Sequence, residues 1–227
     1  MKDLIYKEFR LCMQPLLLLY FLAAFMILIP NYPYLIPCFF IGNAIFNSMQ
    51  MSQANSDILF TAMLPVSKNS IVKAKYLYVV CIQLLFILVT IPVMLLNHAI
   101  VHLPNNAGID ACPAMYLGYF LVFTVFNCTF LPTFYRNVSK IGRAFLVSTI
   151  AVFIAIFLFE GVFIASSAAA DKVHIFAWIK NNIDCWPSSA ASLGIQLGLA
   201  LLGAAVYAVF TYLSYRRSCA LFDKVDI

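Results

Sequence analysis

Charged side chains are scarce in this sequence, at 10% of its 227 residues, whereas 64% of the residues are hydrophobic. Soluble domains carry roughly 25% charged residues, so the composition excludes a soluble globular domain. No Asp, Glu, Lys or Arg occurs from Leu11 to Ser56. A run of that length is too long for one membrane helix of about 20 residues and suits two.

We therefore predict an all-α membrane protein that forms a single transmembrane domain over residues 1–227. A proline-containing break at Ile29 to Pro37, "IPNYPYLIP", separates the first two helices. Four further uncharged runs each accommodate one helix: Tyr76 to Ile109, Ala111 to Tyr135, Ala144 to Phe159 and Cys185 to Tyr215. The six predicted spans cover about residues 11–30, 34–54, 72–96, 113–135, 144–165 and 189–214.

The 14 basic residues are distributed unevenly over this arrangement. If the N-terminus is cytoplasmic, only Lys172 and Lys180 fall outside. The cytoplasmic segments then hold Lys2, Lys7, Arg10, Lys68, Lys73, Lys75, Arg136, Lys140, Arg143, Arg216, Arg217 and Lys224. This is the positive-inside pattern, so we expect both termini in the cytoplasm and no nucleic acid partner. The segment from Lys2 to Arg10 is expected to form a short helix at the cytoplasmic membrane surface.

Clustered catalytic or metal-binding side chains are also missing. The seven cysteines have no metal-ligand spacing, the acids are scattered, and no histidine lies in a predicted span. We therefore expect neither a metal site nor an intramembrane enzyme. The chain has no G-x-x-x-x-G-K-[ST] phosphate loop, so we expect it to bind no cofactor and not to hydrolyse ATP itself. The sequence leaves open whether Cys112 and Cys185, both in external segments, form a disulfide.

The longest predicted cytoplasmic connection lies between the second and third spans, in Asn55 to Leu77. Apolar residues recur there at helical spacing: Ile58, Leu59, Ala62 and Met63. Pro65 ends this predicted helix, and Ser67 is a candidate N-cap for the next. We place Lys68, Lys73 and Lys75 at the lipid headgroups. Lipid anchoring explains these lysines but not Asp57 or the bend, whereas a helix that docks on a cytoplasmic partner explains both.

The segment from Ile58 to Leu77, "ILFTAMLPVSKNSIVKAKYL", resembles the cytoplasmic coupling segment that follows the second span in ABC-2-type transporter permeases. The N-terminal "MKDLIYKEFRL" resembles that family's basic amphipathic beginning. Permeases of similar length and pattern include exporters of amphipathic peptides, such as the phenol-soluble-modulin exporters and related antimicrobial-peptide exporters. Two positions depart from the family pattern: Ser70 replaces a frequent acid or amide, and Lys68 replaces the commoner Arg.

The resemblance implies that a coupling helix inserts into a groove on a separate P-loop ATPase subunit, which carries the ATP and Mg²⁺. The residues assigned to this docking are Asn55, Asp57, Ile58, Leu59, Thr61, Ala62, Met63, Leu64 and Pro65. The resemblance also implies a second copy of this chain or a paralogue, and export across a bacterial plasma membrane. Amphipathic peptides or lipid-like molecules are the expected substrates, and the membrane lipid itself is a partner. A re-entrant helix is implied in the external segment Ser166 to Ser188.

Polar side chains inside the predicted spans are candidates for the substrate pathway. Asn43, Asn47 and Gln50 form one stripe on the second span. The stripe either forms interhelical hydrogen bonds, typically worth about 0.6 kcal/mol each, or lines a central cavity. The family's exporter fold favours the cavity, because spans two and five line its central pathway.

Glu160 is the only acid well inside a predicted span. It is expected either to pair with Lys172 or Lys180 near the outer surface or to recognise a cationic substrate. Phe153 and Phe157 precede it at helical spacing and are candidates for an aromatic wall of the pathway. The alternative function is an ATP-independent channel or secondary transporter in which Glu160 serves as the ion or proton site.

Overall fold

The computed structural model describes residues 4, 6–8, 10, 15–55, 61, 63, 67–100, 105–169 and 173–224. All the regular elements in this part of the chain are helices, as predicted. They are α2 (Pro15–Phe21), the 3₁₀ helix η1 (Leu22–Leu28), α3 (Ile36–Ala54), α5 (Lys68–Ile100), α6 (Met115–Arg136), the 3₁₀ helix η2 (Val138–Lys140), α7 (Ile141–Ala169), α8 (His174–Asn182) and α9 (Ala190–Phe222). Leu4, Tyr6, Lys7, Glu8 and Arg10 are also helical, in the segment predicted as the N-terminal interfacial helix.

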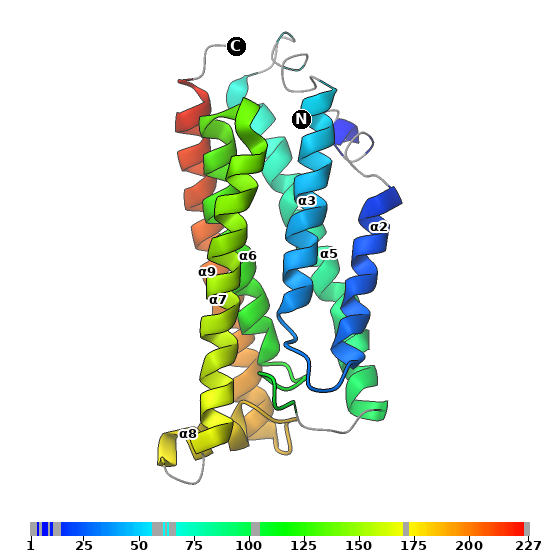
Figure 1. The fold of residues 1–227 in the computed structure, drawn as a ribbon. Coiled ribbons are helices and arrows are strands. Elements are labelled where there is room, and N and C mark those ends of the chain that lie inside the picture. The colour runs from blue at the N-terminus through cyan, green and yellow to red at the C-terminus, as the bar shows by residue number, and fades with distance from the viewer. Residues whose placement is uncertain are drawn as a thin grey trace.

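The long helices run side by side along one axis of the bundle (Figure 1). At one end α5 begins and α3, α6 and α9 end; we call this the basic end, because Lys68, Arg136, Lys140 and Arg217 lie there. At the other end lie α8 and the connections 29–35, 105–114 and 183–189; we call this the α8 end. The predicted cytoplasmic and external segments therefore fall at opposite ends of the bundle, while its orientation in a membrane stays a prediction.

Helix α6 forms the centre of the bundle, because it packs against both α7 and α9. In its most apolar stretch 61% of the residues are buried, against 17% in α9. Phenylalanine rings stack along α6 at centroid distances of 5.0 Å for Phe126 and Phe130 and 6.2 Å for Phe130 and Phe134. The exposed leucines and valines of α9 are therefore available to lipid, which has no unfavourable contact with apolar side chains.

Four of the described helical stretches are long and apolar enough to cross a membrane: Lys68–Ile100, Met115–Arg136, Val138–Ala169 and Ala190–Phe222. They correspond to the third to sixth predicted spans, with bounds that differ by a few residues, so the chain is a multi-pass membrane protein. The second predicted span is observed as α3, whose 19 residues carry no charge but include the polar stripe. The stripe lowers the mean hydropathy of α3, and α3 is not among the four stretches above. The total of six spans therefore stays a prediction.

The first predicted span contains a shorter apolar helical stretch, Leu16–Leu28. It changes from α-helix to 3₁₀ helix at Leu22. A 3₁₀ helix rises about 2.0 Å per residue, against about 1.5 Å in an α-helix. Together α2 and η1 therefore extend about 25 Å, close to the roughly 30 Å thickness of a hydrocarbon core. The change of helix type makes a short segment nearly long enough to span.

A serine cap fixes where α9 begins, and a serine also stands directly before α5. Helix α5 starts directly after Ser67, the predicted N-cap, and the Ser67 Oγ lies 2.7 Å from the Ser70 Oγ. Helix α9 starts after Ser189, whose Oγ accepts from the Ser192 backbone N–H at 3.2 Å in a capping box. Helix α8 confirms the short helix predicted between the fifth and sixth spans; its insertion into a membrane stays a prediction.

Candidate coupling region and membrane pathway

The predicted docking helix lies largely outside the described residues: Asp57, Ile58, Leu59, Ala62, Leu64 and Pro65 are not among them. Asn55 follows α3, and its backbone N–H donates to the Met51 carbonyl oxygen at 3.0 Å. Thr61 is helical and buried, and its Oγ1 accepts a hydrogen bond from Lys7 Nζ. Met63 is 83% exposed. The segment thus contacts the N-terminal helical residues while presenting a large apolar side chain outwards.

A buried ion pair joins the N-terminal segment to α5. Lys75 Nζ lies 2.5 Å from Glu8 Oε2, and the two side chains are only 1% and 2% exposed. Lys75 Nζ also donates to Ser52 Oγ on α3 at 2.9 Å. The prediction that Lys75 lies at the lipid headgroups is therefore wrong. Its neighbours Ala74 and Tyr76 are buried as well, so this part of α5 packs into the interior, and Glu8 supplies the charge that makes burial of Lys75 tolerable.

The polar stripe on α3 forms interhelical hydrogen bonds. Asn43 Nδ2 and Asn47 Nδ2 both donate to the hydroxyl oxygen of Tyr20 on α2, at 3.1 and 2.9 Å. Gln50, the third member of the stripe, is exposed. Hydrogen bonding between α2 and α3 accounts for two members of the stripe, and a role in the substrate pathway stays a prediction.

Glu160 lies on α7 with 3% of its surface exposed, and its carboxylate holds two backbone segments. Its Oε1 accepts from the backbone N–H of Leu35 at 3.1 Å, and its Oε2 accepts from that of Ile109 at 2.8 Å. Gly108 makes this approach possible, because a Cβ there would lie 1.8 Å from Glu160 Oε2. One carboxylate thereby ties the connection between η1 and α3 to the connection between α5 and α6.

The expected pairing of Glu160 with a lysine is not seen within the part of the chain that the structure describes. Lys172 lies outside that part, and Glu160 contacts backbone rather than Lys180. Both carboxylate oxygens accept hydrogen bonds, so the group is satisfied without a cation. Its role in the pathway or as an ion site stays a prediction.

Asp110 and Asp184 extend this network at the α8 end. The Asp184 Oδ1 accepts from the Asp110 backbone N–H at 2.8 Å, and Asp110 Oδ1 accepts from the Asn105 backbone N–H. Asn105 Nδ2 donates to the carbonyl oxygens of Tyr32 and Ile109 at 2.9 and 3.0 Å. Burial raises the pKa of Asp110 and of Asp184 above the ordinary aspartate value. Side chains thus hold all three connections at this end together.

Cys112 and Cys185 lie in the same region as thiols that are not bonded to each other. Cys112 Sγ donates to the Ile183 carbonyl oxygen at 3.2 Å, and Cys185 Sγ donates to that of Asn181 at 3.1 Å. The connections at the α8 end are therefore joined by hydrogen bonds rather than by a disulfide.

The two candidate pathway phenylalanines occupy different environments. Phe153 packs against Phe39 of α3 with ring centroids 4.9 Å apart, and its ring lies 6.3 Å from that of Phe157. Phe157 is 72% exposed, whereas Glu160 faces the interior. The two rings and the acid therefore do not form one wall inside this subunit, although the exposed ring of Phe157 is free to meet lipid or a second subunit.

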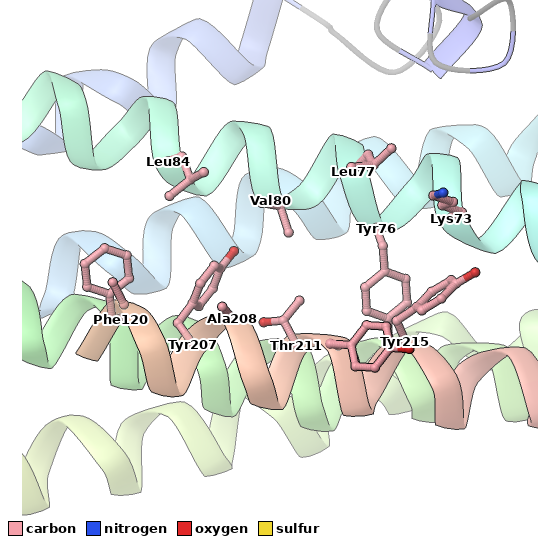
Figure 2. A pocket seen from close by; sticks show the side chains of 12 residues that line it. Lys73, Tyr76, Leu77, Val80, Leu84, Phe120, Tyr207, Ala208, Thr211 and Tyr215 are labelled. Atoms are coloured by element: carbon pink, nitrogen blue, oxygen red, sulfur yellow. The ribbon is translucent and has the colours of Figure 1, made fainter. Parts of the chain in front are cut away.

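A groove of about 570 Å³ runs between α5 and α9. Figure 2 shows Lys73 at one end of it, Leu84 and Phe120 at the other, and the rings of Tyr76 and Tyr207 between them. Sites that hold small molecules usually have volumes of about 300–1,000 Å³. The groove, at about 570 Å³, falls within that range.

The hydroxyl groups of Tyr76 and Tyr207 are satisfied inside the bundle, which leaves their rings to form part of the groove's wall. The Tyr76 hydroxyl shares hydrogen bonds with Ser214 and Ser218 at 2.8 and 2.7 Å. The Tyr207 hydroxyl donates to Gln83 Oε1 at 2.6 Å. The groove is consequently apolar and its wall is held in place by hydrogen bonds.

Sequence reasoning missed three functional candidates: the Glu8–Lys75 pair, Gly108 and the groove tyrosines. A signal for the first was present, because a lysine inside a long apolar helix needs a partner and Glu8 is one of few acids. Gly108 lies in "NNAGID". The glycine itself was a weak signal of a turn or of a close backbone approach, but nothing in the sequence pointed to Glu160 as its neighbour. Tyr76 and Tyr207 are far apart in the sequence, and nothing in it pairs them.

Residues 3–223 match the family model described as "ABC-2 family transporter protein". No curated protein and no solved structure matches the chain.

Proposed function

Because the chain belongs to the ABC-2 family of transporter proteins, we propose that it is the permease subunit of an exporter driven by a separate ATPase. ABC-2 permease domains typically have no catalytic activity of their own, and the family in general implies an ATPase partner. The chain then supplies the path through the membrane, with a second copy or a paralogue completing it. The membrane is the bacterial plasma membrane.

The observation that carries this proposal is the arrangement at the basic end. The segment between α3 and α5 presents Met63, 83% exposed, while Thr61 accepts a hydrogen bond from Lys7. Lys7 is next to Glu8, which pairs with Lys75 of α5. A force applied to this segment from outside the bundle therefore reaches α5 and α3 through buried polar contacts, because removing either charge from its partner is costly.

The α8 end supplies the proposed exit. Glu160 of α7 holds the connection before α3 and the connection before α6 through single hydrogen bonds to Leu35 and Ile109. A shift of α7 relative to α3 and α6 separates these contacts and lets the connections part. ATP binding by the partner closes its two subunits, the coupling segment moves with them, and the α8 end opens.

The groove between α5 and α9 supports an amphipathic peptide or a lipid-like molecule as the substrate. Its wall is formed by apolar and aromatic side chains, with one lysine, Lys73, at the basic end. An amphipathic molecule enters such a groove sideways from the membrane, with its polar part at the basic end and its apolar part along Tyr76 and Leu84 (Figure 2). Such a substrate needs few charged partners, and Lys73 is the charged residue among those that line the groove.

Co-purification from the native membrane tests the proposal. Wild-type chain carrying an affinity tag should retain a P-loop ATPase, and Met63→Asp should weaken that binding by about 30-fold, as expected for loss of an interface anchor worth about 2 kcal/mol. Ser139→Asp adds the same charge at another exposed position of the basic end and should leave ATPase binding unchanged. A wild-type chain that retains no ATPase, or a Met63→Asp chain that retains it fully, contradicts the proposal.

A further inference from the structure

A second, polar pocket lies at the basic end, where α6 turns into α7. Its volume is about 350 Å³, and three basic side chains line it: Arg136, Lys140 and Arg143. They come from the last turn of α6, from η2 and from the first turn of α7, so a tight turn brings three positive charges to one cavity. All three residues are exposed.

Among the described residues, no acid lining this pocket balances its charge. None of the described residues that line it is acidic, and the first turn of α7 contains no Asp or Glu. The positive end of the α7 dipole points to the same place and adds to the field of the three side chains. The pocket is therefore built for an anion, and its mixed lining, with Thr133 and Asn137 beside the cations, offers hydrogen bonds as well.

An exposed apolar surface continues from the pocket along α7. Val147 lines the pocket itself, and Leu146, Ile150 and Ile154 are exposed on the following turns. From Arg143 to Ile154 the helix rises about 16 Å, which is about half of the roughly 30 Å hydrocarbon core. The cations and the apolar stretch thus match the headgroup and the chain depth of one leaflet.

We propose that the pocket of Arg136, Lys140 and Arg143 binds the headgroup of an anionic phospholipid, whose acyl chain lies along α7 at Val147 to Ile154. Basic pockets between membrane helices on the cytoplasmic side bind such headgroups. The apolar stretch decides between a lipid and a free phosphate or nucleotide, because a small soluble anion gains nothing from it. The bound lipid sits on the turn that joins α6 to α7, and α7 carries Glu160.

Lipid retention by the purified chain tests this proposal without any ATPase, so its outcome is separate from that of the proposed function. Delipidated chain in detergent is mixed with equal amounts of dioleoylphosphatidylglycerol and dioleoylphosphatidylcholine, and retained lipid is counted by native mass spectrometry. The wild type should retain phosphatidylglycerol preferentially. Replacing all three pocket cations by Gln should weaken its binding roughly 100-fold, at about fivefold per cation.

A matched control removes the same charge elsewhere at the basic end. Arg216, Arg217 and Lys224 are exposed at the end of α9 and directly after it, and their replacement by Gln should change phosphatidylglycerol binding less than threefold. Size-exclusion chromatography verifies that both triple variants are folded, as expected for exposed positions.

Three results overturn the proposal. Equal retention of the two lipids shows that the pocket does not distinguish an anionic headgroup from a zwitterionic one. An equal loss in the control variant shows that only the summed surface charge attracts lipid. Displacement of the lipid by glycerol 3-phosphate at a similar concentration shows a site for a soluble anion, because a lipid held also through its chain resists that competitor.

Discussion

Glu8 and Glu160 are both buried, at opposite ends of the bundle, but their charges are satisfied differently. Glu8 meets the ammonium group of Lys75 at 2.5 Å. Glu160 meets no basic side chain in the described part of the chain and accepts from the backbone N–H groups of Leu35 and Ile109. The first arrangement joins side chains of the N-terminal segment and α5, and the second joins a helix to two loops.

The difference matters for which end can open. Separating a buried ion pair leaves two stranded charges, so the N-terminal segment and α5 should move together. A carboxylate that leaves two backbone donors loses hydrogen bonds worth about 1.5–3 kcal/mol each, and water can replace them at the surface. The basic end is suited to transmit motion, and the α8 end is suited to yield to it.

The largest effect is expected from breaking the ion pair. Lys75→Met should lower the free energy of unfolding by about 3–5 kcal/mol, because Glu8 is left buried without a partner. Lys73 lies exposed on the same helix, so Lys73→Met should change the free energy of unfolding by less than about 0.5 kcal/mol. Thermal unfolding in detergent measures both.

A double replacement sharpens this result. Glu8→Leu combined with Lys75→Met removes both charges and should recover most of the stability lost in Lys75→Met alone. If Lys75→Met is as stable as the wild type, or if the double variant is less stable than the single one, the pair does not hold the basic end.

The second largest effect is expected at the other acid. Glu160→Ala leaves the N–H groups of Leu35 and Ile109 without their acceptor and should cost about 3 kcal/mol. Gly108→Ala should cost about 1–3 kcal/mol, because its Cβ would lie 1.8 Å from the carboxylate and must displace the loop. Amide hydrogen exchange at Ile109 should rise in both variants. Gly161→Ala, where nothing lies within 4 Å, is the matched control and should leave exchange unchanged.

A smaller effect should appear in the pH dependence of stability. Burial raises the folded-state pKa of Asp184, so the folded chain holds this proton more tightly than the unfolded chain does. The free energy of unfolding should therefore fall as pH rises from about 4 through the raised pKa, and level off above it. Asp184→Asn should make that fall shallower, as measured by melting temperature between about pH 4 and 8.

Asp223→Asn serves as the control, because Asp223 is exposed at the basic end. The pH profile of this variant should match the wild type. An Asp184→Asn profile that also matches the wild type would show that Asp184 is not buried in solution as it is in the structure.

The smallest effect on stability is expected at the uncharged hydrogen bonds between α2 and α3. Tyr20→Phe removes the acceptor for Asn43 and Asn47 and should cost about 1 kcal/mol, since interhelical hydrogen bonds in membranes average about 0.6 kcal/mol. Gln50→Leu on the same stripe should cost less, because Gln50 is exposed. If Tyr20→Phe instead abolishes export while the melting temperature is unchanged, the stripe belongs to the substrate pathway.

The helices were predictable, because long uncharged runs admit little else in a membrane, and Ser67 and the Ile29–Pro37 break mark their limits. The partners of their polar residues were not. Glu8 and Lys75 are separated in the sequence by α2, η1 and α3, and Glu160 binds backbone groups, which every residue carries and no motif reveals. Tyr20 offers one hydroxyl to two asparagines on the next helix, and only packing decides which face of α2 turns towards them.

The central claim is that motion received at the basic end releases the connections held by Glu160 at the α8 end. Amide hydrogen exchange in the permease–ATPase complex tests it most directly. Adding a non-hydrolysable ATP analogue should raise exchange at the backbone N–H groups of Leu35 and Ile109, while Ser52 and Lys75 of the basic end stay protected. Unchanged exchange at Leu35 and Ile109 in a complex that binds the analogue and exports its substrate would contradict the account.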